Sequence, residues 1–248
     1  MKKTTLAKRI SALSLAAFLA LSLAACGAPR ERGLTTDDAT QCVQVEMDTT
    51  YKGQFAGFVE FYSNVTTQDA KDQYNDNIEG EAAYFLALIG MPDPEDQSLV
   101  VEPSAMQIHK AETIYKDIYA KSDYTVLSAS KPDDGTFSVK VTIRPMDILT
   151  LVSDNMEDYF ADFTAKFDKV DTDSMSDEEF VTWYRTVYVP EYYDTMLGLL
   201  ESQVPDIGYT DEKSIVIQVQ QAEDGSLYIS VDDLRNLDDL IIDYSGNY

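Results

Sequence analysis

The spacing of apolar residues along the chain follows two patterns after position 36. In several stretches apolar side chains recur every three or four residues, which is the pattern of helices that bury one face. In two other places the period falls to two, which is typical of half-buried strands. The sequence therefore predicts a helix-rich chain that contains two β-hairpins.

Capping residues and helix breakers set the limits of the predicted helices. Thr36 is the predicted cap of the first helix, Pro145 lies in the predicted first turn of the fourth, and Pro190 is expected to kink or divide the fifth. In the third helix, the periodicity places Ile108 on the inward face. The predicted helices cover about 37–51, 66–89, 104–121, 145–167, 176–200 and 231–242.

The two hairpins are predicted around glycine-containing turns. The first pairs 124–128 with 137–143 across the turn at 132–135, and the second pairs 214–219 with 227–229 across Asp224-Gly225. The expected fold class is α+β: a helix-rich single domain with two β-hairpins forming one antiparallel sheet. Because helices followed by a hairpin occur twice, a duplicated helix–hairpin unit is one interpretation of this order.

The N-terminal residues have the organisation of a lipoprotein signal. Four basic residues precede an apolar run over 10–21, which is short for a membrane-spanning helix and suits a cleavable signal peptide. Small residues then lead to Cys26, a pattern that resembles the bacterial lipobox. We predict a signal peptide at 1–25, a lipidated tether at 26–36 and an α+β extracytoplasmic domain at 37–248. The alternatives are an ordinary secretory signal with a chance cysteine and an uncleaved anchor helix.

The charge of the chain limits the partners that it can have. Removal of 1–25 takes away four basic residues and no acid, which lowers the formal net charge from −25 to −29. Such a charge opposes nucleic-acid binding and repels anionic lipid headgroups. A lipid on Cys26 would therefore have to hold the protein on the outer face of the cell membrane.

Few residues suggest chemistry. Cys42 is the only other cysteine and is expected to be a buried, inert thiol rather than a redox or intermolecular one. His109 is the only histidine and is expected to be exposed, and no known nucleophile, zinc or phosphate-loop motif accompanies it. With 44 acids in the chain, carboxylate pairs cannot be singled out from the sequence.

Two segments allow a binding role besides a structural one. The acidic stretch 168–179 can bind Ca²⁺ through carboxylates, but a capping box of Ser176 and Glu179 also explains its end, and we favour that explanation. The aromatic residues of 183–193 can form a stacking platform for a glycan, but their helical spacing favours core positions. Among them Tyr193 is expected to be the most exposed.

Four segments carry a resemblance to a known group of proteins. They are 48–53 (DTTYKG), 119–126 (YAKSDYTV), 141–148 (VTIRPMDI) and 238–244 (DDLIIDY). Together they resemble uncharacterised lipoproteins of Gram-positive, Clostridia-like bacteria that form a domain-of-unknown-function family, and the likeness covers most of 40–245. It implies a surface lipoprotein and supplies no catalytic residues.

The sequence thus favours a lipid-anchored, non-enzymatic module that binds a protein, peptide or envelope component. It assigns no catalytic, metal or cofactor-binding residues, and Cys26 is its one site residue. A solute-capturing lipoprotein that feeds a transporter is the first alternative, although the chain shows no doubly wound alternation of strands and helices. A carboxylate-dependent hydrolase of cell-wall polymer is the second.

Overall fold

A four-stranded antiparallel sheet organises the protein, which was analysed as a computed structural model. The structure describes residues 34–62, 65–90, 99–131, 136–222 and 226–244, so Cys26, the signal peptide and both predicted hairpin turns lie outside the described residues. The strands have the order β1-β2-β3-β4 and pair with antiparallel neighbours, which confirms the α+β prediction. They are β1 (Asp123–Val126), β2 (Phe137–Arg144), β3 (Lys213–Gln221) and β4 (Leu227–Ile229).

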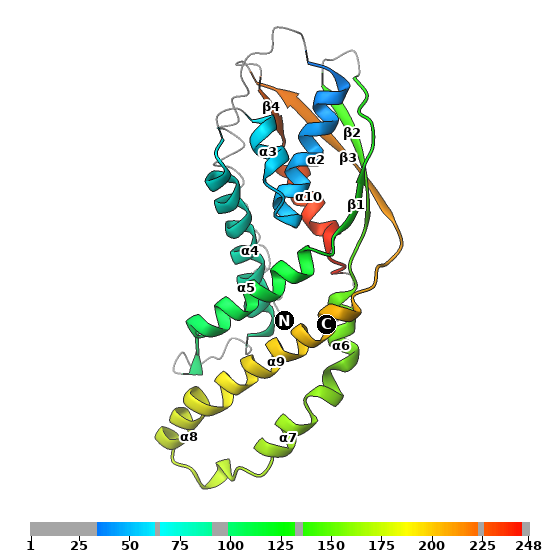
Figure 1. Cartoon of the computed structure of the whole chain (residues 1–248). Helices are drawn as coiled ribbons and strands as arrows, with labels where there is room; N and C mark the ends of the chain where they lie inside the picture. The colour runs from blue at the N-terminus through cyan, green and yellow to red at the C-terminus, as the bar shows by residue number, and fades with distance from the viewer. Residues whose placement is uncertain (1–33, 63–64, 91–98, 132–135, 223–225, 245–248) are drawn as a thin grey trace.

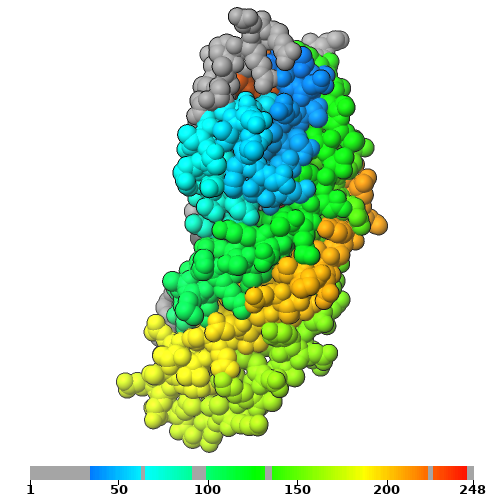
Figure 2. All heavy atoms as spheres, in the orientation of Figure 1, coloured from blue at the N-terminus to red at the C-terminus, as the bar shows by residue number. Residues whose placement is uncertain are grey.

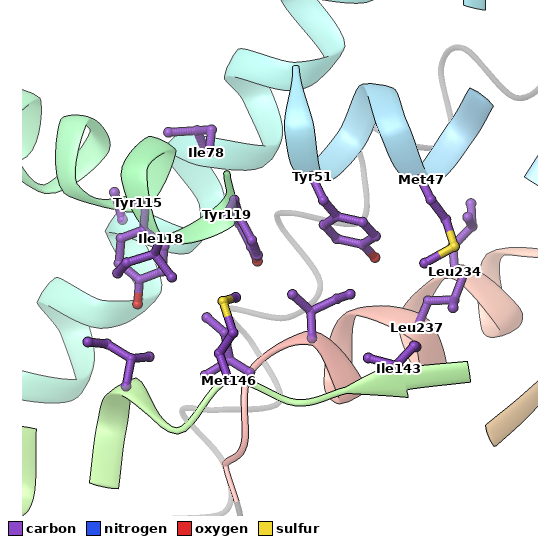
Figure 3. Packing of buried hydrophobic residues seen from close by; sticks show 14 of the residues in the cluster. Met47, Tyr51, Ile78, Tyr115, Ile118, Tyr119, Ile143, Met146, Leu234 and Leu237 are labelled. Atoms are coloured by element: carbon purple, nitrogen blue, oxygen red, sulfur yellow. The ribbon is translucent and has the colours of Figure 1, made fainter. Parts of the chain in front are cut away.

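The sheet has one buried face. Alternate residues of β2 and β3 are fully buried, and their neighbours are half-buried or exposed, as the period-two pattern predicts. Helices α2 (Thr36–Lys52) and α10 (Val231–Ile241) cover the buried face, as Figure 1 shows. The core between them includes Met47, Ile143, Leu234 and Leu237 (Figure 3).

The first helix begins one residue earlier than predicted. Thr35, not Thr36, is the cap: its hydroxyl accepts from the Asp38 amide, and the Asp38 carboxylate accepts from the Thr35 amide and hydroxyl. Sequence reasoning chose the neighbouring threonine because either can supply the capping oxygen. Gly53 ends α2 with φ 61°, and the short helix α3 (Ala56–Phe61), which was not predicted, follows.

A pair of helices lies beside the body formed by the sheet and α2. The pair consists of α4 (Thr67–Ile89) and α5 (Ala105–Tyr119), and each helix begins with a capping box, formed by Thr66 with Asp69 and by Ser104 with Gln107. Gly90 ends α4 as predicted, while 91–98 of the following loop lie outside the described residues. The Ile108 prediction was wrong: 41% of this side chain is exposed, because the inward face of α5 begins at Gln107 and continues at Ala111.

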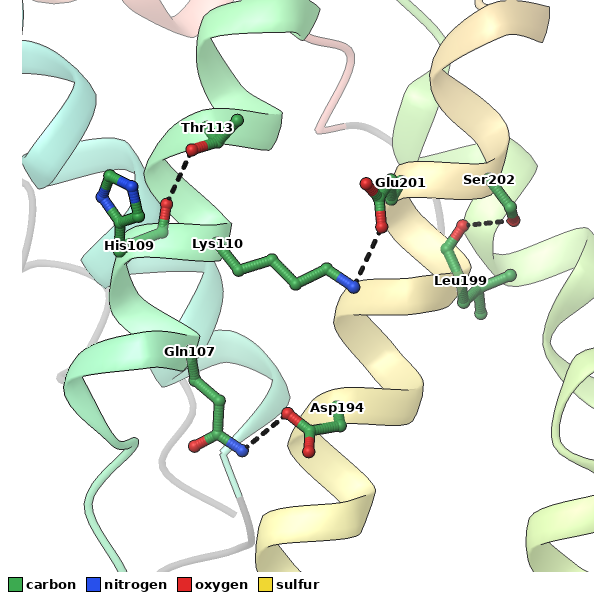
Figure 4. A network of polar contacts seen from close by, with 8 residues as sticks. All are labelled: Gln107, His109, Lys110, Thr113, Asp194, Leu199, Glu201 and Ser202. Carbon is green, nitrogen blue, oxygen red and sulfur yellow. Dashed lines mark hydrogen bonds and ion pairs between the residues drawn. The ribbon is translucent and has the colours of Figure 1, made fainter.

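The chain between β2 and β3 forms a helical extension on the far side of α5. Its long helix α9 (Val189–Gln203) packs against α5, where Gln107 donates to Asp194 over 2.9 Å and the Lys110 ammonium lies 2.9 Å from Glu201 (Figure 4). The other elements are α6 (Ile148–Tyr159), α7 (Ala161–Phe167), a 3-10 turn (Thr172–Ser174), α8 (Asp177–Trp183) and a π-helical turn (Tyr184–Tyr188). Figure 2 shows this extension as the lower end of the molecule.

Three details of this extension differ from the prediction. Pro145 does not enter a helix, because its carbonyl accepts from the Thr210 amide and α6 begins only at Ile148. The predicted continuous helix also breaks at Phe160, which leaves Tyr159 41% exposed. Pro190 does not divide its helical stretch: it follows the π-helical turn, and the helical conformation continues from Asp177 to Gln203.

The segment after α10 closes the fold at the junction of the sheet and the extension. The Met146 amide donates to the Ile241 carbonyl over 3.0 Å, and the Asp243 amide donates to the Met146 carbonyl over 2.8 Å. Met146 is fully buried, and Figure 3 shows it facing Tyr119. Within the described parts of the chain, no helix combines the length and apolar character needed to cross a membrane.

The left-handed conformation of Gly53 gives a test of the fold. A Cβ at this position would lie 3.3 Å from the Tyr74 ring, and an L-residue at this φ costs about 1–2 kcal/mol. We expect Gly53→Ala to lower the free energy of unfolding by about that amount, measured by urea denaturation. Gly53→Asn adds the same Cβ but tolerates the conformation better, so it should cost less. If both variants lost the same free energy of unfolding, the left-handed backbone conformation of Gly53 would not be the cause of the loss.

Candidate functional site

The structure places the residues that sequence analysis named at separate points. His109 is on α5 with 80% of its side chain exposed, and Glu112 lies 3.5 Å from its Nδ1. Cys42 is fully buried in α2, where its sulfur lies 3.3 Å from the Tyr62 hydroxyl. Neither residue has the companions of a nucleophilic or metal site among the described residues.

The acidic stretch 168–179 forms the exposed link between α7 and α8. The Ser176 hydroxyl accepts from the Glu179 amide, and the Glu179 carboxylate accepts from the Ser176 amide and hydroxyl, as the predicted capping box requires. These bonds hold the pKa of Glu179 below its usual value. In the part of the chain that the structure describes, no three metal-ligating side chains come together.

The aromatic stripe is part of a larger group of rings. Rings from α6–α7 pack on rings from α8–α9: the Phe163 and Tyr188 centroids are 5.3 Å apart, and those of Phe167 and Trp183 are 5.9 Å apart. Most of these rings are half-buried. This aromatic cluster consists of Phe160, Phe163, Phe167, Phe180, Trp183, Tyr184, Tyr188 and Tyr192.

The expectation for Tyr193 was wrong. This residue is 5% exposed, because the face of α9 that carries it packs against the body together with Met196, Leu197 and Leu200. Trp183, Tyr184, Tyr188 and Tyr192 are the half-exposed members of the stripe. The π-helical turn adds a residue to one turn of the helix and shifts the faces on either side of it, which a regular 3.6-residue period cannot anticipate.

Sequence analysis missed a group of acids and tyrosines where α2, α4, α5 and α10 meet. The Tyr51 hydroxyl donates to Asp238 Oδ1 over 2.6 Å, and the Tyr244 hydroxyl lies 3.3 Å from Glu81 Oε2. The Tyr119 hydroxyl also bonds to Glu81, and the Tyr51 and Tyr119 rings are 5.6 Å apart (Figure 3). These contacts bring Glu81 and Asp238, which we call the acid pair, into one environment.

Both residues of the acid pair are half-buried, and their partial loss of solvent changes their protonation. This loss of solvent raises the pKa of Glu81 to about 7. Burial, and then the charge of Glu81, raises the pKa of Asp238 to about 8, although the bond from Tyr51 opposes this rise. Carboxyl groups that titrate near neutrality can exchange protons at physiological pH. The sequence could not single them out, because nothing in the spacing of the 44 acids marks these two.

A further half-buried acid, Glu46, lies on α2. Glu46 Oε1 accepts from the Tyr62 hydroxyl over 2.8 Å, and Gln73 Nε2 on α4 lies 3.5 Å from Glu46 Oε2. Burial raises the pKa of Glu46 to about 7. Burial, followed by the charge of Glu46, also raises the pKa of the Cys42 thiol well above its usual range. A thiol in this state is neutral and a poor nucleophile.

Comparison with known proteins gives limited context. No protein-family model matches the sequence, and no curated protein matches it. Among solved structures, the chain is similar to a Bacillus subtilis protein named "putative lipoprotein (ycdA)", with a TM-score of 0.49 and 18% identity over 83% of this chain. The match spans 56% of the Bacillus protein. This neighbour is a Gram-positive protein with a lipoprotein name, and the domain-of-unknown-function family inferred from sequence stays a prediction.

The environment of Cys42 predicts its reactivity. In a Cys26→Ser variant, where Cys42 is the remaining thiol, we expect no reaction with a thiol reagent at neutral pH until the protein is unfolded in urea. The same background with Val216→Cys, at a position that is 50% exposed, provides a reactive control. Rapid labelling of folded Cys42 would show that α2 opens locally.

Proposed function

We propose that the protein is a lipoprotein, held by Cys26 on the outer face of the cell membrane, and that it binds a cationic polypeptide through the helical extension. The observation that carries this proposal is the position of two parts of the molecule. The described chain enters α2 at one end of the body, and α7 and α8 lie at the opposite end (Figure 1). A short tether at the first end would leave the second end facing outward.

Hydrogen bonds support this placement of the two ends. The Ala129 amide donates to Thr40 near the start of α2, and the Tyr124 hydroxyl donates to Asp48 near its end. Helix α2 therefore starts beside the turn end of the first hairpin. β2 then runs from that end toward Met146, after which α6 leads away from the body.

The distal surface has the charge and the side chains that favour a cationic partner. We call residues 154–192 the arm; it contains eleven acids and three basic residues, a formal net charge of −8. The half-exposed rings of the aromatic cluster lie on the same elements. Negative charge beside aromatic rings favours lysine and arginine side chains, which bind carboxylates and the faces of rings.

One internal contact shows how a cation binds to this surface. The Lys166 ammonium pairs with Glu191 and lies 5.1 Å from the centroid of the Phe167 ring. A lysine of a partner would find the same combination of carboxylate and ring elsewhere on the arm. A non-enzymatic role agrees with this surface, because binding of this kind requires no reacting group.

The anchor is tested by replacing the lipidated cysteine. We expect Cys26→Ser to move the protein from the membrane fraction to the medium or to leave an uncleaved precursor, detected by immunoblotting of separated fractions. Cys42→Ser is the matched control and should stay with the membrane. Unchanged membrane association and processing of the Cys26 variant would contradict the lipid anchor.

The arm is tested with a labelled lysine-rich peptide and fluorescence anisotropy at low salt. We expect Asp171→Asn, Asp173→Asn and Asp177→Asn together to weaken binding roughly tenfold, since three exposed ion pairs contribute about 1–2 kcal/mol. The matched control removes three exposed acids outside the arm, with Asp206→Asn, Asp211→Asn and Glu212→Gln. Equal weakening by both triples would mean that only the net charge attracts the peptide, and the arm would not be the site.

A further inference from the structure

We propose that the acid pair is a proton-operated latch: Glu81 and Asp238 hold α10 and the following segment closed while they are protonated, and their ionisation releases residues 231–244 from the body. This proposal is independent of the proposed function, because it concerns contacts within the body. It rests on the contacts of the pair and on the charges that face it.

The contacts of the pair connect the C-terminal segment to three other elements. Asp238 of α10 accepts from Tyr51 of α2, and Tyr244 beyond α10 bonds to Glu81 of α4, which Tyr119 of α5 also contacts. The bonds of Asp238 and Tyr244 therefore join residues 231–244 to the body. The bond from Tyr119 holds Glu81, which is the partner of Tyr244. Apolar packing of Leu234, Leu237 and Ile241 adds to these bonds.

Among the described residues, the groups whose charges or hydrogen bonds act on the pair are tyrosines and acids, which supply no positive charge. Around Glu81 they are Tyr51 of α2, Tyr84 of α4, Tyr115 and Tyr119 of α5, Asp238 and Asp239 of α10, and Tyr244. In the described segments, neither acid takes part in an ion pair. Lys52, at the end of α2, lies over the Tyr124 ring instead, 4.1 Å from its centroid.

Two charged carboxylates in this environment would repel each other, and tyrosine hydroxyls rather than cations would compensate their charge. Ionisation of an acid that is shielded from solvent is costly unless a cation or several donors stabilise it. Protonation removes both the repulsion and the loss of solvation, while the tyrosine hydroxyls continue to donate to the carboxyl oxygens. The closed state is therefore favoured when at least one acid of the pair carries a proton.

The direction of the pH effect follows from the shifted pKa values. In the closed state the pKa of Glu81 is about 7 and that of Asp238 is about 8, while in the released state both return toward about 4. The closed state therefore binds more protons between these values, so closure is favoured at mildly acidic pH and is lost as pH rises through 7–8.

Release of the latch would also affect the junction between the body and the helical extension. Met146, which precedes α6, exchanges two backbone hydrogen bonds with Ile241 and Asp243. Detachment of residues 231–244 removes both bonds. The same step also uncovers the part of the sheet face that α10 contacts.

Hydrogen exchange measured by mass spectrometry at about pH 6 and about pH 8.5, corrected for intrinsic exchange, tests the latch. Between these values we expect amides of 231–241 to lose at least about tenfold more protection than amides of β2 and α5, which corresponds to about one pKa unit. Equal loss in all elements would indicate global unfolding, and no loss in α10 would indicate that the pair does not titrate; either result overturns the proposal without any variant.

A double variant tests whether Glu81 and Asp238 cause the pH-dependent loss of protection in α10. Glu81→Gln with Asp238→Asn keeps the oxygens that accept from the tyrosines and removes the charges, so α10 should stay protected at both pH values. The matched control, Asp211→Asn with Glu212→Gln, changes two exposed acids and should behave as the original protein. A pH-dependent release that persists in the Glu81/Asp238 variant would assign the titration to other groups and refute the latch.

Discussion

Burial of one face of the sheet is the constraint on which the rest of the molecule depends. Val139 and Val141 of β2 pair with Ile217 and Ile215 of β3, and this pairing joins two hairpins that are separated by about seventy residues of sequence. A shift of one residue between these strands would turn their apolar side chains toward solvent. The register therefore fixes where the intervening helices leave and re-enter the body, and with them the position of the arm.

The acidity of the chain imposes a second constraint, because few basic residues are present to neutralise carboxylates that are partly shielded from solvent. With 44 acids and 19 basic residues, the fold instead supplies tyrosine hydroxyls as donors to such acids: Tyr51 donates to Asp238, and Tyr62 donates to Glu46. A neutral donor compensates an ionised acid less well than a cation does. The cost is reduced by protonation, which makes the stability of these contacts depend on pH.

Periodicity predicted the helices and strands that bury one face and expose the other. The helical spacing of Cys42, Val43, Met47 and Tyr51 puts them on one face of the first predicted helix, and all four are buried. The same is true of the second predicted helix, whose spaced residues Ile78, Ala82, Phe85, Leu86 and Ile89 are buried. Both hairpins and one antiparallel sheet were predicted from alternation and turns alone. The errors lie where local geometry departs from a regular helix: the break at Phe160, and the π-helical turn before Tyr193.

The candidate sites were less predictable than the fold, for a different reason. The sequence has one histidine and, besides Cys26, one cysteine, so their surroundings could be predicted. The structure confirmed that His109 is exposed and that Cys42 is buried. Glu81 and Asp238 are 157 positions apart and belong to helices that carry several other acids, so only the packing of four helices brings them together. That packing also explains why the pair matters to the rest of the chain. The segment that carries Asp238 continues directly into the backbone bonds of Met146, and Met146 lies between the strand that fixes the body and the helix that begins the extension. A proton bound at the pair therefore stabilises the one junction that the body, the C-terminal segment and the extension share.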